Sequence, residues 1–576
     1  MKLKSKYIIP LAIVVLAGSC KKHLDINHDP NNPTSLPISK ILPTVERNLG
    51  LALSMGPSWT NDYAAPSGGL GMQLETYVHR TTQRGTPPDQ YTVAGTDFYM
   101  QAGWTDMYGL VLNNTERIIA DGTAAGNMQY VGIAKIIKAY AFSQLVDIFG
   151  DVPFSEANKL KEQNTAPKFD DDATIYPALF ALIDEAIANL NATATNALRP
   201  GNDDAIYRGN IPNWIRAANT LKLKLYTQER LVKNVSTEVN ALITANNMIK
   251  QTSEGFMLPF GSSVSPDDRN PGQREYFASQ RSIDISPWFY ETMKGINQFM
   301  PGTGNFNNPD PRIPYYFFNQ IKVGQVAPND ANQTEYRDGS FVSIYFGTTG
   351  PDAGRSQQNT LTTLGIYPSG GRYDDGQGRG AGLNQNSATG AAPYRFITYA
   401  DRLYLEAELM RAGVATGDAR AKLLAALNES FKQVDYVVNL AKGSQNPPAL
   451  VGRADVTTYI NNVMAAYDAD PTKQLQIIMT QKWIQSFGNG VDAYTDYRRT
   501  RFPIIFDPND PVMAPNHFVQ PPINGDPVNP GAQKKVPVQT SLPYPLSIPW
   551  PTVELDVNAN APAQKNPSTY KPFWLP

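Results

Sequence analysis

Apolar residues recur at helical spacing on both sides of a central stretch of the chain that lacks this spacing. The pattern predicts helices over residues 104–121, 127–149, 172–190, 210–232, 398–411, 418–439 and 471–487. Asn210 is a predicted N-cap for one helix, and Asp172 or Thr174 for another. Gly150 and Gly488 follow the ends of two more. Taken in pairs, the helices predict a mainly α fold with a tetratricopeptide-like α-solenoid scaffold, although the repeat of about 34 residues is not regular.

The central stretch, from residue 251 to about residue 393, carries short β-like runs and a glycine-rich loop. Residues 312–319 and 340–347 are rich in aromatic and β-branched side chains, which predicts short strands, and residues 288–295 predict a short helix. The loop itself spans residues 367–383. Irregular stretches of this length are uncommon in a compact protein unless they bind a ligand or are disordered, so we expect a ligand-binding insertion here.

The same pattern divides the chain into segments. We expect a lipoprotein signal peptide (1–19), a flexible tether (20–35), an N-terminal helical part (36–250), a loop-rich ligand-binding insertion (251–395), C-terminal helical pairs (396–500) and a proline-rich tail (501–576). The tail is expected to wrap the surface, because its prolines disfavour helices.

Composition narrows the class of protein. Hydrophobic residues make up 41% of the chain and charged residues 18%, which is enough apolar content for a core and too little charge for a disordered chain. The formal net charge is −2, so electrostatic binding of nucleic acid is not expected. These values indicate a globular protein.

The N-terminus has the pattern of a bacterial lipoprotein signal. Three lysines precede an apolar stretch over residues 7–16, and Ala17, Gly18 and Ser19 lie directly before Cys20, which is the only cysteine in the sequence. The stretch is too short to span a bilayer, which takes about 20 residues, and we expect no spanning segment in the mature chain. Cys20 is therefore the predicted lipidation site, and an incidental cysteine in an ordinary secretory signal is the alternative.

The sequence offers few residues for catalysis. It contains four histidines, which leaves little for a His-rich metal site or a Ser-His-Asp triad. Nucleotide-binding glycine motifs and the common serine-hydrolase and metallohydrolase motifs are absent from it. We expect no catalytic residues, no metal and no cofactor. A glycosidase needs only two carboxylates, so a lipid-anchored glycoside hydrolase is kept as an alternative.

Two groups of acidic residues are candidate sites. Residues 170–172 are three aspartates that could hold calcium or do acid chemistry, but they precede a predicted helix and are better explained as favourable charge at its N-terminus. Glu406 and Glu408 lie two positions apart on a helix and do not face each other. Neither group predicts a site by itself.

Aromatic side chains offer a route to binding, because sugar rings and apolar side chains pack against exposed Trp and Tyr. Trp104, Trp214 and Trp483 lie on apolar helix faces and are expected in the core, and the aromatic run 315–318 is expected to be half-buried in a strand. The candidate ligand contacts lie in loops: Trp59, Tyr63, Tyr77, Trp288, Tyr367 and Tyr373, with Arg372 and Asp374 as polar partners. Residues 367–375 contain few aliphatic side chains and enough glycine to let the others project. Ordinary anchoring of a loop is the alternative for each candidate.

Several segments resemble, in the same order, those of the SusD/RagB family of nutrient-binding outer-membrane lipoproteins. Cys20 and residues 24–34 are similar to the lipidated start of the family, and residues 104–114 look like its first paired helix. Residues 134–157 are similar to its most diagnostic segment. Later matches fall at 310–312, 397–408, Trp483, 496–500 and Pro503. The best fit is the second SusD-like group, and the insertion matches least.

The resemblance implies both a location and a function. A SusD-like protein is lipid-anchored in the outer membrane, faces the cell exterior and forms a hinged lid over a SusC-like TonB-dependent transporter barrel. It captures an oligosaccharide or a peptide and passes it to the barrel without chemistry, with its tetratricopeptide-like helices toward the barrel. Nutrient capture is therefore the leading hypothesis, and a glycoside hydrolase or a structural surface lipoprotein is the alternative.

Overall fold

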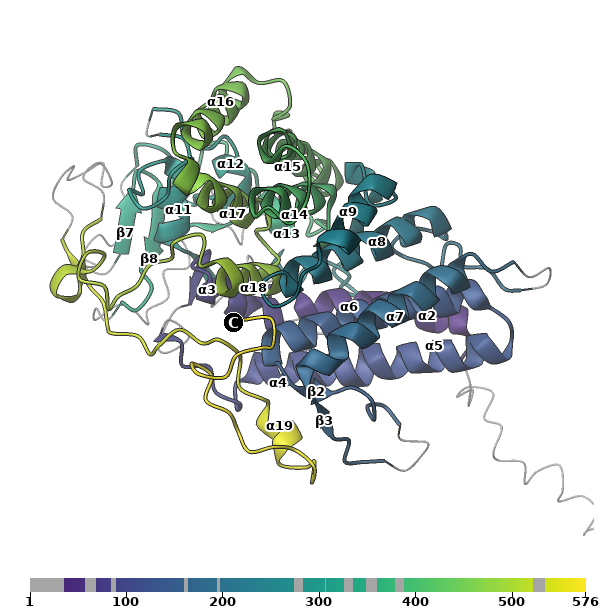
Figure 1. Cartoon of the computed structure of the whole chain (residues 1–576). Coiled ribbons are helices and arrows are strands. Elements are labelled where there is room, and N and C mark those ends of the chain that lie inside the picture. The colour runs from purple at the N-terminus through teal and green to yellow at the C-terminus, as the bar shows by residue number, and fades with distance from the viewer. Residues whose placement is uncertain are drawn as a thin grey trace, which may run out of the picture.

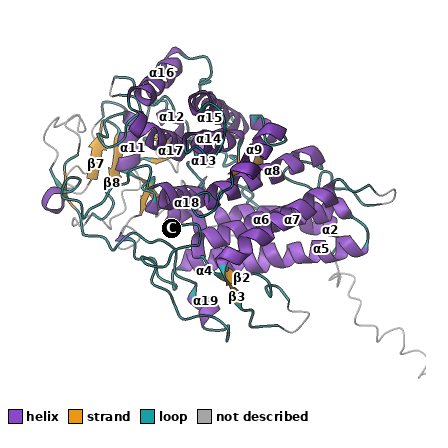
Figure 2. Ribbon diagram, in the orientation of Figure 1, coloured by secondary structure: helices purple, strands orange, loops and turns teal. Residues whose placement is uncertain are grey.

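The computed structural model describes residues 36–56, 69–83, 90–159, 164–193, 197–273, 283–305, 307–325, 335–348, 360–378, 388–521 and 534–576. Within these ranges helices dominate the regular structure, and the strands form short two-stranded pairs (Figure 2). The predicted mainly α architecture is confirmed. The predicted signal peptide, Cys20 and the predicted tether lie outside the described residues.

The N-terminal helices pack around one central helix. They are α2 (Ile38–Leu53), α3 (Leu70–Tyr77), α4 (Phe98–Thr105), η3 (Asp106–Leu112), α5 (Asn113–Ala124), α6 (Met128–Phe149), α7 (Asp172–Leu190), α8 (Ile211–Glu229) and α9 (Ser236–Ala245). α6 packs against α2, α5 and α7 and buries nearly all of its side chains, so it is the core of this group (Figure 1). Gly150 ends α6, as predicted, with a φ of 72° that favours glycine.

The first predicted helix, residues 104–121, is part of a longer helical run. α4, η3 and α5 follow one another without a break, and η3 has π-helical geometry. A π-turn holds more residues than an α-turn and so shifts which side of the helix is buried. Trp104 before this shift, Met107 within it and Ile118 after it all lie in the core.

Side-chain caps define the starts of α7 and α8. The cap of α7 is Asp171, whose carboxylate accepts a hydrogen bond from the Ala173 amide. The predicted caps, Asp172 and Thr174, lie one and three positions too late in the sequence. Asn210 caps α8 as predicted, by accepting from the Asn213 amide. These polar residues therefore fix where two core helices begin.

α7 is also the one helix in the described ranges that is long and apolar enough, by length and composition alone, to cross a membrane. Its Leu179 and Ile183 pack into the core formed with α6. Its Asp184 forms an ion pair with Lys222 of α8, with 2.7 Å between Oδ1 and Nζ. α7 is thus a core helix of the folded protein, and core helices of this kind also meet the criteria of length and composition.

The C-terminal helices form a second group. They are α14 (Tyr399–Arg411), α15 (Ala419–Ala441), α16 (Ala454–Ala469), η6 (Pro471–Lys473), α17 (Gln474–Gln485) and α18 (Gly490–Thr500). α14 packs against α15, as predicted, and a capping box between Thr398 and Asp401 starts α14. The apolar spacing did not predict α16 and α18. In α18 the reason is that its buried face includes Arg498 and Arg499, which an apolar pattern does not reveal.

The central stretch connects the two groups with short elements. They are η5 (Thr252–Glu254), β4 (Phe256–Leu258), β5 (Ile283–Ile285), α11 (Pro287–Lys294), α12 (Ile313–Tyr316), β6 (Phe317–Phe318), β7 (Glu335–Asp338), β8 (Phe341–Ile344), β9 (Thr363–Leu364), α13 (Ile366–Ser369) and β10 (Tyr394–Ile397). All strand pairs are antiparallel: β10 with β4, β6 with β9, β7 with β8, and β5 with β1 (Thr81–Gln83). α11 and β8 match the predicted short helix and one predicted strand.

The aromatic run 315–318 differs from its prediction. Tyr315 and Tyr316 belong to the short helix α12, and only Phe317 and Phe318 form a strand. All four side chains are buried instead of half-buried. The reason is tertiary packing, since residues distant in sequence cover both sides of the run. Tyr316, for example, stacks on Tyr367 with 4.8 Å between ring centroids.

The last segment of the chain packs back onto the first helical group. It contains η7 (Pro515–His517), β11 (Phe518–Val519) paired with β12 (Val536–Pro537), and α19 (Thr552–Leu555). It runs next to the pair β2 (Val152–Pro153) and β3 (Phe169–Asp170), as Figure 1 shows. Trp550 donates a hydrogen bond to the Asp151 carbonyl (2.8 Å), and Trp574 is fully buried. The tail therefore contributes to the core as well as covering the surface.

Arg80 joins the two helical groups. It follows α3 and donates hydrogen bonds to Glu75 of the same segment and to the Trp483 carbonyl at the end of α17. α3 and α18 pack closely, because Gly490 has no side chain and a Cβ there would lie 2.5 Å from the Gly71 carbonyl oxygen. The two groups thus form one continuous hydrophobic core.

Candidate functional site

A pocket of about 390 Å³ lies between α11 and the C-terminal tail. Trp288 and Glu291 line it from α11, residues 296–299 from the turn that follows, and Tyr345 from the segment after β8. The tail supplies the other lining residues: Val512, Met513, Pro515, Phe518, Val519, Gln520 and Lys535. This pocket combines aromatic, aliphatic and hydrogen-bonding groups, which is the usual make-up of a small-molecule or sugar-binding site.

Two aromatic side chains form one wall of the pocket. The rings of Trp288 and Phe299 are nearly parallel, with centroids 5.6 Å apart and planes inclined by 25°. The Trp288 Nε1 group donates to the Ile504 carbonyl at 3.0 Å, which fixes the indole. Trp288 is only 6% exposed, whereas Phe518 is 41% exposed. Phe518 therefore offers the larger stacking surface to a ligand, and Trp288 supports the wall behind it.

A glycine turn positions Phe299. Gly295 ends α11 with a φ of 72°, and a Cβ at this position would lie 2.7 Å from the backbone of Asn305. The amide of Ile296 donates to the Glu291 carbonyl at 3.1 Å, which closes the helix end. The chain then returns along the helix and brings Phe299 over Trp288. Gly295 is the sequence signal that could have located this wall.

Glu291 is the acidic residue among the lining residues. Its Oε1 accepts a hydrogen bond from the Tyr345 hydroxyl at 3.1 Å. Burial raises the pKa of Glu291 to about 7; hydrogen bonding from Tyr345 opposes the rise, and the nearby charge of Asp338 adds to it. Within the described ranges no lysine or arginine forms an ion pair with Glu291. The pocket therefore holds a carboxyl group whose ionised form lacks a compensating charge.

The glycine-rich loop does not line this pocket, and the expectation that its side chains project is not met at Tyr367. Tyr367 is fully buried, and its hydroxyl donates to the Gln485 carbonyl at 3.0 Å. Arg372 is 3% exposed and lies 5.5 Å from the ring centroid of Phe318. Long-range packing supplies the core that the loop's own composition lacks. Tyr367 and Arg372 therefore pack inside the protein and offer little side-chain surface to a ligand.

The neighbouring loop residues hold the loop in place. Tyr373 is half-buried against Tyr315, with 4.9 Å between ring centroids. Asp374 accepts hydrogen bonds from the side-chain amide of Asn319 (2.7 Å) and from the Gly376 amide (2.9 Å). Their contacts account for the loop conformation, and a ligand role for Tyr373 and Asp374 stays a prediction.

The other predicted contacts are placed differently. Tyr77 is 1% exposed, and its hydroxyl accepts from the Val93 amide at 3.0 Å, so it is a core residue in the structure. Trp59 and Tyr63 lie outside the described residues. Trp288 is thus the predicted contact that the structure places at the pocket. Glu291 could have been found from it, because residues three apart share a helix face, whereas no local signal marks Phe518 in the tail.

The predicted core tryptophans are confirmed. Trp104 and Trp483 are each 3% exposed, and Trp214 is fully buried with its Nε1 group donating to Asp204 at 2.8 Å. The two glutamates of α14 are also buried. Glu406 pairs with Arg402 of the same helix and with Lys422 of α15, and Glu408 pairs with Arg230 and Arg499. The guanidinium groups hold the pKa of Glu408 below its usual value despite its burial. Both glutamates join helices and do not form a site.

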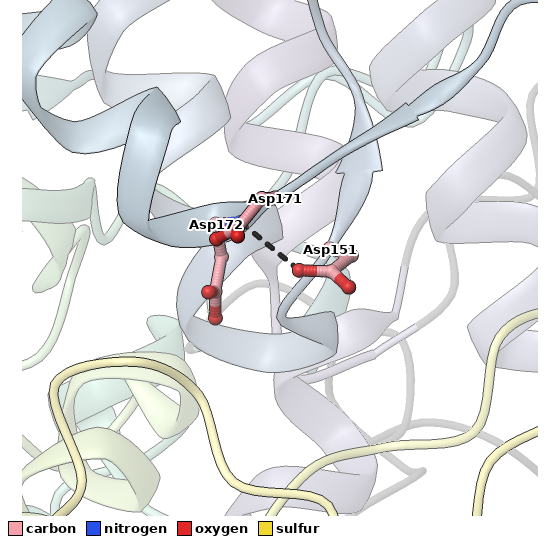
Figure 3. Close-up of side chains that lie close together, drawn as sticks. All are labelled: Asp151, Asp171 and Asp172. Carbon is pink, nitrogen blue, oxygen red and sulfur yellow. Dashed lines mark hydrogen bonds between the residues drawn. The ribbon is translucent and has the colours of Figure 1, made fainter.

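Asp151, Asp171 and Asp172 form the metal-type cluster of the described residues, with carboxylate oxygens within 4.8 Å of one another (Figure 3). Each already has a structural partner. Asp151 accepts from the Asp172 amide at 2.9 Å, which is the dashed line in Figure 3, and Asp171 caps α7. Asp172 accepts from the Phe573 amide at 2.9 Å. The cluster thus ties the start of α7 to the end of α6 and to the tail, in agreement with the helix-start interpretation.

A family model matches most of the chain. The second SusD-like family, described as "Starch-binding associating with outer membrane", matches residues 57–521. A comparison with curated proteins finds no match.

Solved structures share the fold over nearly the whole chain. A chitin-binding protein is 18% identical with a TM-score of 0.62, and the match covers 91% of this chain and 94% of that one. A SusD/RagB family protein from Bacteroides thetaiotaomicron is 18% identical with a TM-score of 0.61, covering 91% and 95%. A SusD homolog from Bacteroides uniformis is 17% identical with a TM-score of 0.58, covering 93% and 99%. At these identities the likeness shows a shared fold.

Proposed function

Because the chain belongs to the SusD-like family described as starch-binding and associating with the outer membrane, we propose that it is a glycan-binding accessory protein of that membrane. In this role it captures an oligosaccharide in the pocket between α11 and the tail. It then passes the ligand to a SusC-like TonB-dependent transporter without changing it chemically. Capture of a peptide is the alternative, and the binding experiments below distinguish it from capture of an oligosaccharide.

The pocket beside α11 is the observation that carries the proposal. Its aromatic groups, Phe518 and the Trp288–Phe299 wall, suit the apolar face of a sugar ring. Gln298 adds an exposed side-chain amide that can both donate and accept hydrogen bonds with hydroxyl groups. The volume of about 390 Å³ falls within the range of about 300–1,000 Å³ found for ligand pockets.

The lining also supports binding without catalysis. Glycoside hydrolysis requires two carboxyl groups about 5–9.5 Å apart across the scissile bond. Among the described lining residues Glu291 provides one carboxyl, and no second one faces it across the pocket. Hydrolysis would need a second carboxyl group, which these lining residues do not supply. Capture and delivery is therefore the function that this lining favours.

Cys20 and the transporter complete the proposal. A lipidated Cys20 would hold the protein on the outer membrane facing outward, and the helical groups would face the barrel. The motifs that resemble SusD/RagB lipoproteins support this arrangement. Co-purification of the full chain with a TonB-dependent barrel from the same cells tests it, and a chain that never co-purifies with such a barrel would contradict the delivery step.

Calorimetry with a panel of oligosaccharides and peptides tests capture, and chromatography of the same mixtures tests for products. We expect saturable binding of at least one oligosaccharide with no product. Phe518→Ala should weaken that binding by about ten- to a hundredfold, the loss of one stacking platform by analogy with base stacking. Released product would establish an enzyme, and binding of peptides alone would identify a peptide carrier.

Phe98→Ala is the matched control for Phe518→Ala. Phe98 is 48% exposed on α4 and does not line the pocket, so it resembles Phe518 in type and exposure. Its replacement should leave the affinity unchanged. If both variants lost affinity equally, or if neither did, the pocket would not be the binding site.

A further inference from the structure

The charges around the pocket indicate what the captured glycan carries. Glu291 lines the pocket from α11 and accepts a hydrogen bond from Tyr345. Asp338 of β7 adds negative charge nearby, although Lys294 pairs with it at 3.4 Å between Nζ and Oδ2. Tyr336, also on β7, and Tyr345 are the other titratable groups that face Glu291. Lys535 is the cation on the pocket lining, and it is exposed on the tail, where solvent screens it.

A buried carboxylate without a cation is costly, and a ligand that brings the cation removes that cost. The aromatic wall favours the same ligand, because the faces of Trp and Phe rings attract positive charge. An uncharged sugar would gain only hydrogen bonds at Glu291, and an acidic sugar would be repelled. The aromatic wall and the charges therefore agree on a positively charged group next to Glu291.

We propose that the pocket selects oligosaccharides containing unsubstituted amino sugars, whose protonated amino group pairs with the Glu291 carboxylate beside the Trp288–Phe299 wall. This inference rests on the proposed function and names the ligand class of that site. The pairing stabilises the ionised form of Glu291, which is largely protonated in the free protein below its pKa of about 7. Binding near pH 6 therefore releases a proton from Glu291 to the buffer.

Calorimetry near pH 6 tests the inference with three oligomers of one length: a glucosamine oligomer, the matching N-acetylglucosamine oligomer and a maltooligosaccharide. The wild-type protein should bind the glucosamine oligomer at least about tenfold more tightly than the other two. Glu291→Gln removes the charge and keeps the shape of the side chain. It should remove this preference with a loss of roughly tenfold or more, and it should abolish the proton release seen when buffers of different ionisation enthalpy are compared.

Lys535→Gln makes the opposite change of charge in the same pocket. Because it removes a positive charge that repels a protonated amino group, it should tighten the binding of the glucosamine oligomer. If Lys535→Gln weakened binding more than Glu291→Gln, the pocket would not favour a positively charged ligand and the inference would be wrong. Thermal unfolding of each variant shows whether a loss of binding comes from a loss of folding.

The remaining outcomes separate this inference from the proposed function. Equal or tighter binding of the uncharged oligomers overturns the amino-sugar preference and leaves glycan capture standing. Glu291-dependent binding of a lysine-rich peptide, with no binding of the glucosamine oligomer, overturns both in favour of a peptide ligand. Binding of no oligosaccharide overturns the proposed function itself.

Discussion

Replacing Arg80 with methionine tests the contact that joins α3 to α17 and α18. The side chains of Arg80 and Glu75 are completely buried. All five N–H groups of the guanidinium have acceptors between 2.6 and 3.0 Å away. Glu75 accepts two of these bonds, and the other three go to the Trp483 carbonyl, the Ser486 hydroxyl and the Asn489 carbonyl. Methionine has a similar length but donates none of them.

The expected cost follows from what methionine leaves behind. Glu75 would keep one partner, the Gly488 amide at 3.0 Å from Oε1. Burial raises the pKa of Glu75 even with Arg80 beside it, so the carboxylate depends on that charge. Removing one member of a buried ion pair costs roughly 3–5 kcal/mol of unfolding free energy. Adding Glu75→Gln to Arg80→Met removes the stranded charge. The double variant should therefore be more stable than the sum of the single variants by about 1–3 kcal/mol.

Urea unfolding followed by tryptophan fluorescence and by circular dichroism measures these differences. Coincident transitions by the two signals are required before free energies are compared, because a chain of this length can unfold in steps. If Arg80→Met lowered the free energy of unfolding by less than about 1 kcal/mol, the reasoning would be refuted, because even an exposed surface ion pair can contribute that much. Strict additivity of the two substitutions would refute the claim that Arg80 compensates the charge of Glu75.

Three further predictions concern the core, acid stability and the anchor. Trp104→Ala should destabilise the protein by about 3–5 kcal/mol, because a buried aromatic side chain leaves a cavity, and a wild-type melting temperature would contradict this. Burial lowers the pKa of His79 from 6.5 to about 3, so unfolding takes up a proton between these values and stability should fall as the pH drops below about 6.5. In His79→Gln that slope should be reduced, which pH-dependent urea unfolding measures. Cys20→Ser should release the protein from the outer membrane and prevent labelling with palmitate, and an unlabelled wild type would contradict lipidation.

The sequence predicted those helices whose signals are local. Asn210 and Thr398 lie at helix starts where short-range hydrogen bonds act. The apolar spacing of α15 indicates one continuous buried face, and α6 is apolar and buried almost all round. α18 was missed because its buried arginines are satisfied only by distant partners. Arg499, for example, bonds to Glu408, 91 positions earlier in the chain.

The candidate site was harder to predict for the same reason. Glycines in the loop at 367–375 suggested projecting side chains, but the Tyr367 hydroxyl bonds to the Gln485 carbonyl, 118 positions away, and its ring stacks on Tyr316. Trp288 was predicted, because an aromatic residue in the loop-rich insertion is visible in the sequence. Phe518 lies near α11 only because of the path that the tail takes, and no local sequence pattern specifies that path.

The bond from Arg80 to Ser486 also sets an order of assembly during folding. The two residues are 406 positions apart, so their contact closes a long loop of chain and forms late. The bundle around α6 can form before it from contacts between neighbouring helices. Arg80 and Glu75 can be enclosed only when α17 arrives. A chain truncated before Trp483 would therefore hold every N-terminal helix and still expose a charged pair that the finished protein buries completely.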